Sequence, residues 1–162
     1  MPMTSTELIP LLIHELEKLL SIATAAANDA RDLATHEQSK PETQYDTVGL
    51  EASYLAHGQS QRVAELKLAI KQWQGLALRA PSNKSKVDLG CLVVVVDEYE
   101  NESYYLIGPS AGGIKLSNNT KSINVITRNA PLGAALFNCY VDDEISIKIN
   151  TNEIFYTVVS IR

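Results

Sequence analysis

The feature that most constrains the fold is a pair of repeats in the first half of the chain, each with a strict 3-4 spacing. The first repeat consists of Ile9, Leu12, Leu16, Leu19, Ala23, Ala26, Ala30 and Leu33. The second consists of Gly49, Ala52, Ala56, Gln59, Val63, Leu66, Ile70 and Trp73. This spacing places residues on one stripe of a helix, as in a coiled-coil seam. We therefore predict two long helices that pack against each other.

A polar segment at 35–41 separates the two repeats and ends in Pro41, which predicts a short turn between the helices. The two helices would then form an antiparallel hairpin. Thr4, Ser5 or Thr6 can cap its start, with Glu7 in the first turn. Near the turn the facing residues are alanines and Gly49, so the hairpin is expected to be slim at its tip and bulkier at its base.

The chain changes character near Pro81, after which β-branched runs and turn residues dominate. Strands are predicted at 91–96, 104–107, 123–127, 144–149 and 154–159, with one short helix at 131–137. The run 91–96 is continuously apolar, which predicts a strand buried on both faces. The expected fold class is α+β: a coiled-coil hairpin at 1–80, a linker at 81–86 and a small β-rich domain at 87–162.

Composition restricts the function classes. The net charge of −5 argues against autonomous binding to bare DNA or RNA. Cys91 and Cys139 lie in apolar runs without a second metal ligand at a suitable spacing, so we interpret them as buried free thiols. No apolar run approaches the ~18 residues of a membrane span, and no signal peptide is visible. We expect a soluble cytoplasmic protein without a membrane partner.

Several segments resemble one family. The segment 130–136 reads Ala-Pro-Leu-Gly-Ala-Ala-Leu and resembles the Ser-Pro-Leu-Gly-x-Ala-Leu segment of the Gre transcript-cleavage factors. The strand entry at 141–147 and the strand at 105–108 are similar to Gre segments as well. The stretch 45–56 looks like a divergent Gre-related subgroup. The chain thus resembles the GreA/GreB family along nearly its whole length.

The resemblance implies an FKBP-like β domain that binds RNA polymerase core at the rim of its secondary channel. The expected docking residues are Pro131, Leu132, Gly133, Leu136 and Phe137. The hairpin would enter the channel, where tip carboxylates of Gre factors help to hold a second Mg²⁺ for cleavage of backtracked RNA. The protein would be an accessory factor and not an enzyme. It would have no cofactor or metal of its own and would reach the nascent RNA 3′ end only through the polymerase. We expect a monomer.

The tip departs from the founding Gly-Asp-Leu-x-Glu-Asn motif, which is absent here. The available carboxylates are Glu37, Glu42 and Asp46. Glu42 and Asp46 are four residues apart, a spacing that lets both share an ion from one helix face. The same region also fits a capping box, with Ser39 as the cap, Glu42 three residues later and Pro41 in the first turn. Both interpretations stay open.

Basic residues of the hairpin leave a similar choice. Lys40 and Arg62, with Lys67 and Lys71, can line a face that follows the displaced RNA 3′ end, or they can be ordinary solvated charges. Three alternatives to a cleavage factor remain. They are a secondary-channel regulator without cleavage activity (Rnk-like or anti-Gre-like), an FKBP-like prolyl isomerase or chaperone, and a plain coiled-coil interaction protein.

Overall fold

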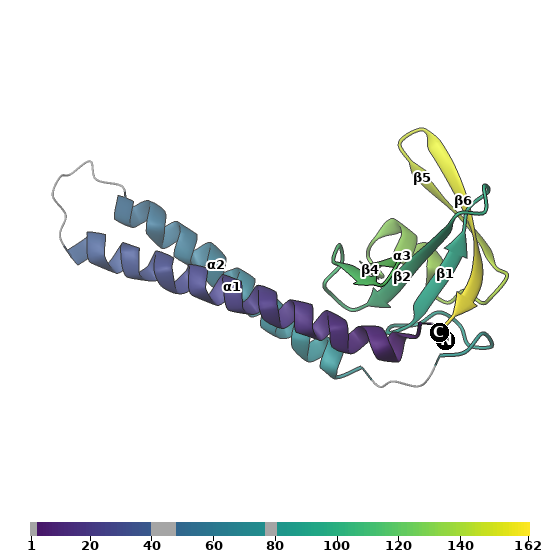
Figure 1. Ribbon diagram of the computed structural model, residues 1–162. Coiled ribbons are helices and arrows are strands. Elements are labelled where there is room, and N and C mark those ends of the chain that lie inside the picture. Colours follow the sequence, from purple (N-terminus) through teal and green to yellow (C-terminus); the bar gives the residue numbers. More distant parts are fainter. Residues whose placement is uncertain (1–2, 40–47, 77–80) are drawn as a thin grey trace. The chain divides into compact units, whose positions relative to one another are not determined.

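The computed structural model describes residues 3–39, 48–76 and 81–162 (Figure 1). Its elements are α1 (Ser5–Ser39), α2 (Val48–Gln74), β1 (Leu92–Val96), β2 (Glu102–Gly108), β3 (Lys115–Asn118), β4 (Lys121–Thr127), α3 (Pro131–Leu136), β5 (Glu144–Ile149) and β6 (Asn152–Ile161). Two long helices therefore precede a six-stranded mixed sheet with one short helix, and the predicted α+β class is confirmed.

The chain divides into two units. The sheet unit comprises Met1–Ile13 with Gln72–Arg162, and the hairpin unit comprises His14–Lys71. The first turns of α1 and the last residues of α2 thus belong with the sheet. The expected division into a hairpin at 1–80, a linker at 81–86 and a β-rich domain at 87–162 rests on the change in residue types along the chain and stays a prediction.

The start of α1 is fixed by a capping interaction within the sheet unit. The backbone N–H groups of Glu7 and Leu8 donate to the Thr4 carbonyl at 3.2 and 3.3 Å. In return, the Thr4 N–H donates to Oε2 of Glu7 at 3.4 Å. The N–H groups of Thr4 and Glu7 are donors that the first turn of a helix otherwise leaves free, and the helix starts where the sequence predicts it.

In the hairpin unit, the seam of α2 lies where the sequence predicts it. Gly49, Ala52 and Leu66 are buried, and Ala56, Gln59 and Val63 are half-buried. The seam of α1 is shifted: its buried positions are Ala23, Ala27, Ala30 and Ala34. The predicted Ala26 is half-buried, and Leu33 is 47% exposed. A straight helix has 3.6 residues per turn, so its buried stripe drifts past a strict seven-residue repeat. The prediction was confirmed at Ala23 and Ala30 and was wrong by one position at Ala26 and Leu33.

This shift gives the first testable prediction. Ala30→Leu is expected to lower the free energy of unfolding of the hairpin unit by about 1–3 kcal/mol, because Ala30 is only 5% exposed and its site has no room for three more carbons. Leu33→Ala, on an exposed position of the same helix, should stay within about 0.5 kcal/mol of wild type. Thermal unfolding followed by helical circular dichroism measures both. A loss in Leu33→Ala as large as the loss in Ala30→Leu would instead support the strict repeat.

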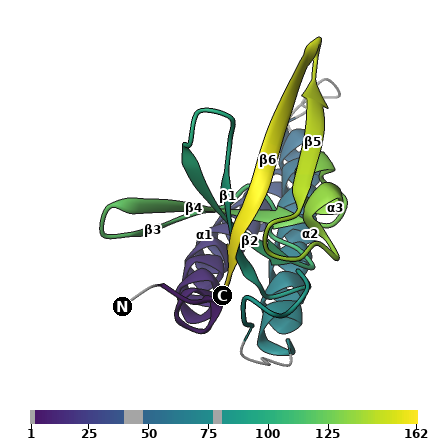
Figure 2. The ribbon, with the colours of Figure 1, turned by 90° about the vertical axis from the view of Figure 1, so that its right-hand side faces the viewer.

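The sheet has the strand order β3-β4-β2-β1-β6-β5 (Figure 2). All neighbouring strands are antiparallel except β2 and β4, which are parallel. The predicted terminal hairpin of β5 and β6 is confirmed. The sequence missed β3, and it placed Glu102 and Ser103 in a turn and Gly108 in a loop, although all three lie in β2. It also placed 35–39 in the turn, whereas α1 continues through Ser39.

The central strand β1 is buried on both faces, as predicted: Leu92, Val93, Val94 and Val95 are at most 2% exposed. Val93 and Val95 belong to a core cluster with Leu136 of α3. Leu92 pairs with Leu106 on the opposite face. On that face Trp73, at the end of α2, lies against Gly108. The sheet unit is therefore a layered structure, with α3 on one face and the end of α2 on the other.

Candidate functional site

The predicted tip residues lie mostly outside the described part of the chain. Glu42, Asp46 and Lys40 belong to the segment 40–47, as do Pro41 and the second half of the proposed capping box. Glu37 lies in the last turn of α1, with its side chain outside the described ones. The two interpretations of these residues, as ion ligands and as helix caps, therefore both stay predictions.

Arg62 lies in the middle of α2 on an exposed position. Its Nη1 is 3.8 Å from Oε2 of Glu65, and both side chains are more than half exposed. Such a long, exposed ion pair contributes little to stability, so the guanidinium keeps its ability to bind another anion. Lys67 and Lys71 are exposed on the same helix.

The predicted docking segment forms α3, which begins with Pro131 as a first-turn proline. Leu136 is fully buried in the core cluster. Gly133 is also buried, and it lies against Thr127, the last residue of β4. Pro131 is exposed, whereas Leu132 and Phe137 are half-buried. The five predicted residues therefore divide into two that fix α3 on the sheet and three with surface available to a partner.

A cation accompanies this surface. The guanidinium carbon of Arg128 lies 4.0 Å from the centre of the Phe137 ring, within the range of a cation–π contact. Arg128 follows β4 and Phe137 follows α3, so the two meet only because α3 folds back onto the end of that strand. Sequence reasoning missed Arg128, because nothing in the local pattern relates it to Phe137.

The cysteines are placed as free thiols, with Cys91 buried and Cys139 half-buried. Burial raises the pKa of the Cys91 thiol, and burial also raises the pKa of Cys139. Thiols of this kind are poor nucleophiles at neutral pH, because the thiolate is the reactive form. They point to packing and not to redox or covalent chemistry.

The raised thiol pKa predicts a loss of stability at alkaline pH. A group whose folded pKa is above its unfolded one stabilises the fold below its ordinary value, about 8.5 for a thiol, and this contribution is lost as pH rises through the folded value. The melting temperature should therefore fall above about pH 8.5. Cys91→Val should flatten this decline. Burial also raises the pKa of Tyr156, so part of the slope persists. An identical slope in Cys91→Val and wild type would contradict the assignment.

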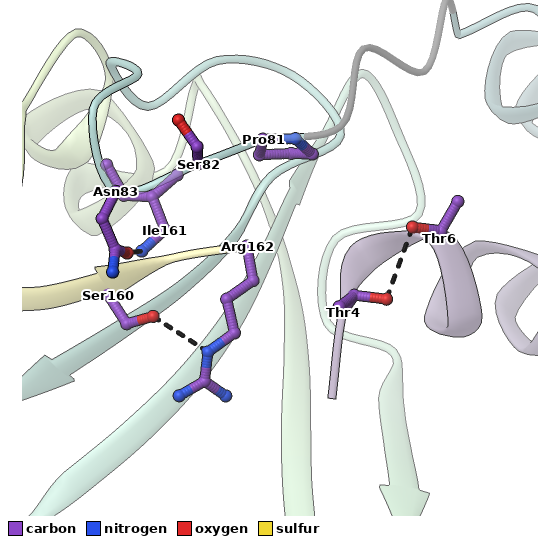
Figure 3. Close-up of a pocket in the computed structure, with 8 residues that line it drawn as sticks. All are labelled: Thr4, Thr6, Pro81, Ser82, Asn83, Ser160, Ile161 and Arg162. Carbon is purple, nitrogen blue, oxygen red and sulfur yellow. Dashed lines mark hydrogen bonds between the residues drawn. The ribbon is translucent and has the colours of Figure 1, made fainter. Parts of the chain in front are cut away.

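A pocket of about 290 Å³ lies between the start of α1 and the end of β6, both within the sheet unit (Figure 3). Its polar groups are largely paired with one another. Nε of Arg162 donates to Oγ of Ser160 at 2.9 Å, and the Ile161 N–H donates to Oδ1 of Asn83 at 3.0 Å. The second of these bonds fastens Asn83 to the last strand. The polar residues that line the pocket therefore serve to hold the surrounding chain segments together, and they do not point to a ligand.

Two further classes of site are missing from the described ranges 3–39, 48–76 and 81–162. No group of three or more His, Cys, Asp or Glu side chains there is arranged to hold a metal ion. None of the helices in the same ranges combines the length and the apolar character needed to cross a lipid bilayer.

Comparison with known proteins decides the family. The sequence model for the C-terminal part of the transcription elongation factors GreA/GreB matches residues 82–162. This range contains the whole sheet together with α3. The chain belongs to the GreA/GreB family.

Members of the GreA/GreB family are also similar to this chain over nearly its whole length. Transcription elongation factor GreA of Novosphingobium aromaticivorans is 26% identical over 168 aligned positions, which cover 99% of each protein. Among solved structures, Gfh1 of Thermus aquaticus is 20% identical, with 92% of each chain covered and a TM-score of 0.42. Gfh1 of Thermus thermophilus is 17% identical, with 93% of this chain and 94% of that one covered and a TM-score of 0.39.

Proposed function

We propose that this GreA/GreB-family protein acts in the cytoplasm as an accessory factor that binds RNA polymerase core at the rim of its secondary channel and modulates elongation. The family match over 82–162 carries the proposal, because it covers all of the segment expected to dock. The pair of long helices supports it, since a slim hairpin of α1 and α2 suits entry into a narrow channel.

The docking surface in this proposal is the exposed part of α3 with its neighbours: Pro131, Leu132, Phe137 and Arg128. An apolar ring beside a cation is typical of the residues that dominate protein interfaces. Gly133 and Leu136 act indirectly by holding α3 on the sheet. Phe137→Ala should therefore weaken binding to core polymerase, whereas Tyr99→Ala, in an exposed turn at 97–101 that lies outside the proposed surface, should not.

The tip has a second role in the cleavage version of the proposal. Glu37, Glu42 and Asp46 would offer carboxylate oxygens, which are the ligands that Mg²⁺ prefers. Their chemistry thus fits a Mg²⁺ shared with the polymerase active site. The ion, when bound, lowers the pKa of a water and so supplies the nucleophile for phosphodiester hydrolysis. Lys40 and Arg62 would face the phosphates of the displaced RNA 3′ end.

The cleavage version makes a sharp prediction for the double variant Glu42→Gln and Asp46→Asn. Both changes keep the size of the side chain and remove its charge, so ion binding is lost while the hairpin is retained. A transcript-cleavage assay on a stalled elongation complex should show stimulation by wild type and none by the variant. Both proteins should bind core polymerase equally well.

The same assay separates this version from the regulator without cleavage activity, which is favoured by the absence of the founding tip motif. Binding of wild type without stimulated cleavage would establish that regulator. Full cleavage by the double variant would show that Glu42 and Asp46 are not the ligands. Absence of binding to core enzyme at micromolar concentration would overturn the proposed function as a whole.

A further inference from the structure

The strand β5 is at one edge of the sheet, and its outer side has no partner strand in the described ranges 3–39, 48–76 and 81–162. In both ribbon views the β5–β6 hairpin extends beyond the neighbouring strand β1 (Figures 1 and 2). An edge strand exposes a row of backbone N–H and C=O groups and is a template for pairing with another strand. The chemistry of β5 decides which strand fits.

The backbone direction along β5 follows from a hydrogen bond at its start. The Val158 N–H donates to the Asp143 carbonyl at 2.9 Å, so position 143 directs its carbonyl at β6. Directions alternate along an antiparallel strand, and the β5–β6 register runs without a bulge to the pair of Ile149 and Asn152. The residues that direct their backbone groups at the free edge are therefore Glu144, Ser146 and Lys148.

The side chains of β5 divide between two faces in the same alternation. Glu144, Ser146 and Lys148 are exposed on one face. On the other face Ile145 packs against the core cluster, and Ile147 is half-buried beside it. The apolar core therefore extends to β5, where α3 packs beside the strand.

The sequence of β5 is complementary to itself. If two copies pair antiparallel about Ser146, Glu144 of each copy lies opposite Lys148 of the other, and Ile145 lies opposite Ile147. All three edge-facing residues then meet edge-facing residues, as the hydrogen-bond pattern requires. Opposite charges and apolar pairs directly across two strands both stabilise a sheet.

Neighbouring registers lack this match. Pairing about Ile145 sets Glu144 opposite Ser146 and Lys148 opposite Asp142, which lies outside β5 at a positive φ. Pairing about Ile147 sets Lys148 opposite Ser146 and leaves Glu144 unmatched. A lysine on an edge strand ordinarily discourages pairing, but here it selects one register.

We infer that this protein forms a homodimer in which the β5 strands of two copies pair antiparallel about Ser146 and join the two sheets. The dimer replaces the monomer expected from the sequence. The pairing uses the backbone of β5 and none of the proposed docking residues Pro131, Leu132, Phe137 and Arg128, although α3 packs against β5.

Sedimentation equilibrium on the full-length protein tests the inference. Wild type should pass from monomer to dimer as its concentration rises from micromolar to submillimolar. Ser146→Pro should stay monomeric, because proline removes the edge-facing N–H that the second copy needs but no bond to β6. Circular dichroism checks that this variant is folded. A wild type that is monomeric throughout, or an equally strong Ser146→Pro dimer, would overturn the proposal.

Charge reversal gives a test that does not depend on proline. Lys148→Glu sets like charges against each other twice in the dimer and should weaken dimerisation about tenfold or more. Adding Glu144→Lys to the same chain restores both opposite-charge pairs and should restore the dimer. If the double variant dimerises no better than Lys148→Glu alone, the register is wrong.

A cross-link fixes the register directly. Ser146→Cys places two thiols opposite each other, at a backbone separation that a disulfide can span. Lys148→Cys is the matched control, since it is equally exposed but has its counterpart four residues away along the strand. Mild oxidation should cross-link the first variant and not the second, with wild type as background for Cys139. Equal cross-linking of the two variants would count against ordered pairing.

Discussion

Trp73→Ala is expected to lower the free energy of unfolding of the sheet unit by about 3–5 kcal/mol. The indole is 1% exposed, and its ring lies against Gly108 of β2. Its Nε1–H donates to the Ser110 carbonyl at 3.2 Å. Truncation would leave a large cavity on one face of the sheet and would remove the partner of that carbonyl.

The measurement is denaturant unfolding followed by circular dichroism, because Trp73 is the chain's one tryptophan and its fluorescence is lost in the variant. Trp73→Phe separates the two contributions. Trp73→Phe keeps most of the apolar ring and loses the hydrogen bond. Its loss of unfolding free energy should therefore be smaller than that of Trp73→Ala, with about 1 kcal/mol due to the lost bond. A loss in Trp73→Ala below about 1 kcal/mol would contradict the packing described here.

Gly108 provides the matching half of a double-mutant cycle. A Cβ at this position would lie 1.9 Å from the nearest atom of the Trp73 ring, so Gly108→Ala should be strongly destabilising in wild type. In the Trp73→Ala background the ring is gone and the same change should cost much less. Residues in contact commonly couple by about 0.5–3 kcal/mol. Gly58→Ala is the control, since a Cβ there meets nothing within 4 Å and an alanine favours the exposed helix.

This contact also marks the limit of sequence reasoning about the fold. The run at β1 and the alternation of β5 and β6 could be predicted, because each pattern requires knowledge of only a few neighbouring residues. Trp73 was predicted as a seam residue of α2. Its burial follows from that pattern, but its contact with Gly108 joins residues 35 positions apart and has no local signal.

The missed elements have the same origin. The strand β3 reads Lys-Leu-Ser-Asn and contains one buried residue, Leu116, so its composition does not predict a strand. It is a strand because β4 lies beside it. In α1, adjacent alanines at 26 and 27 look alike in the sequence, and only the packed helix distinguishes the buried one.

The candidate site divides in a similar way. The position of α3 could be predicted because its proline marks the first turn of a short helix, whereas the contact of Arg128 with Phe137 depends on how that helix folds back. At the tip, the spacing of Ser39, Glu42 and Asp46 fits both a helix cap and an ion site. Both interpretations use the carboxylate of Glu42, so local spacing cannot choose between them.

Gly133→Ala is the second substitution with a large expected effect. A Cβ on Gly133 would lie 1.9 Å from the carbonyl oxygen of Thr127 and 2.8 Å from its carbonyl carbon. Both are backbone atoms at the end of β4, so the clash is relieved only by shifting α3 away from the sheet. We expect a loss of about 3 kcal/mol, at the upper end of overpacking costs. Ala134→Ser, on the next and exposed position, should stay within about 0.5 kcal/mol of wild type.

The same variant separates two roles for the Pro-Leu-Gly segment. If Gly133 serves only to seat α3, Gly133→Ala should lose stability and polymerase binding together, because a displaced α3 carries Leu132 and Phe137 out of place. Lowering the temperature or adding a stabilising osmolyte would then recover part of both. If Gly133 instead touches the polymerase, binding should fall while the denaturation midpoint stays at its wild-type value. The buried position of Gly133 against Thr127 predicts the first result.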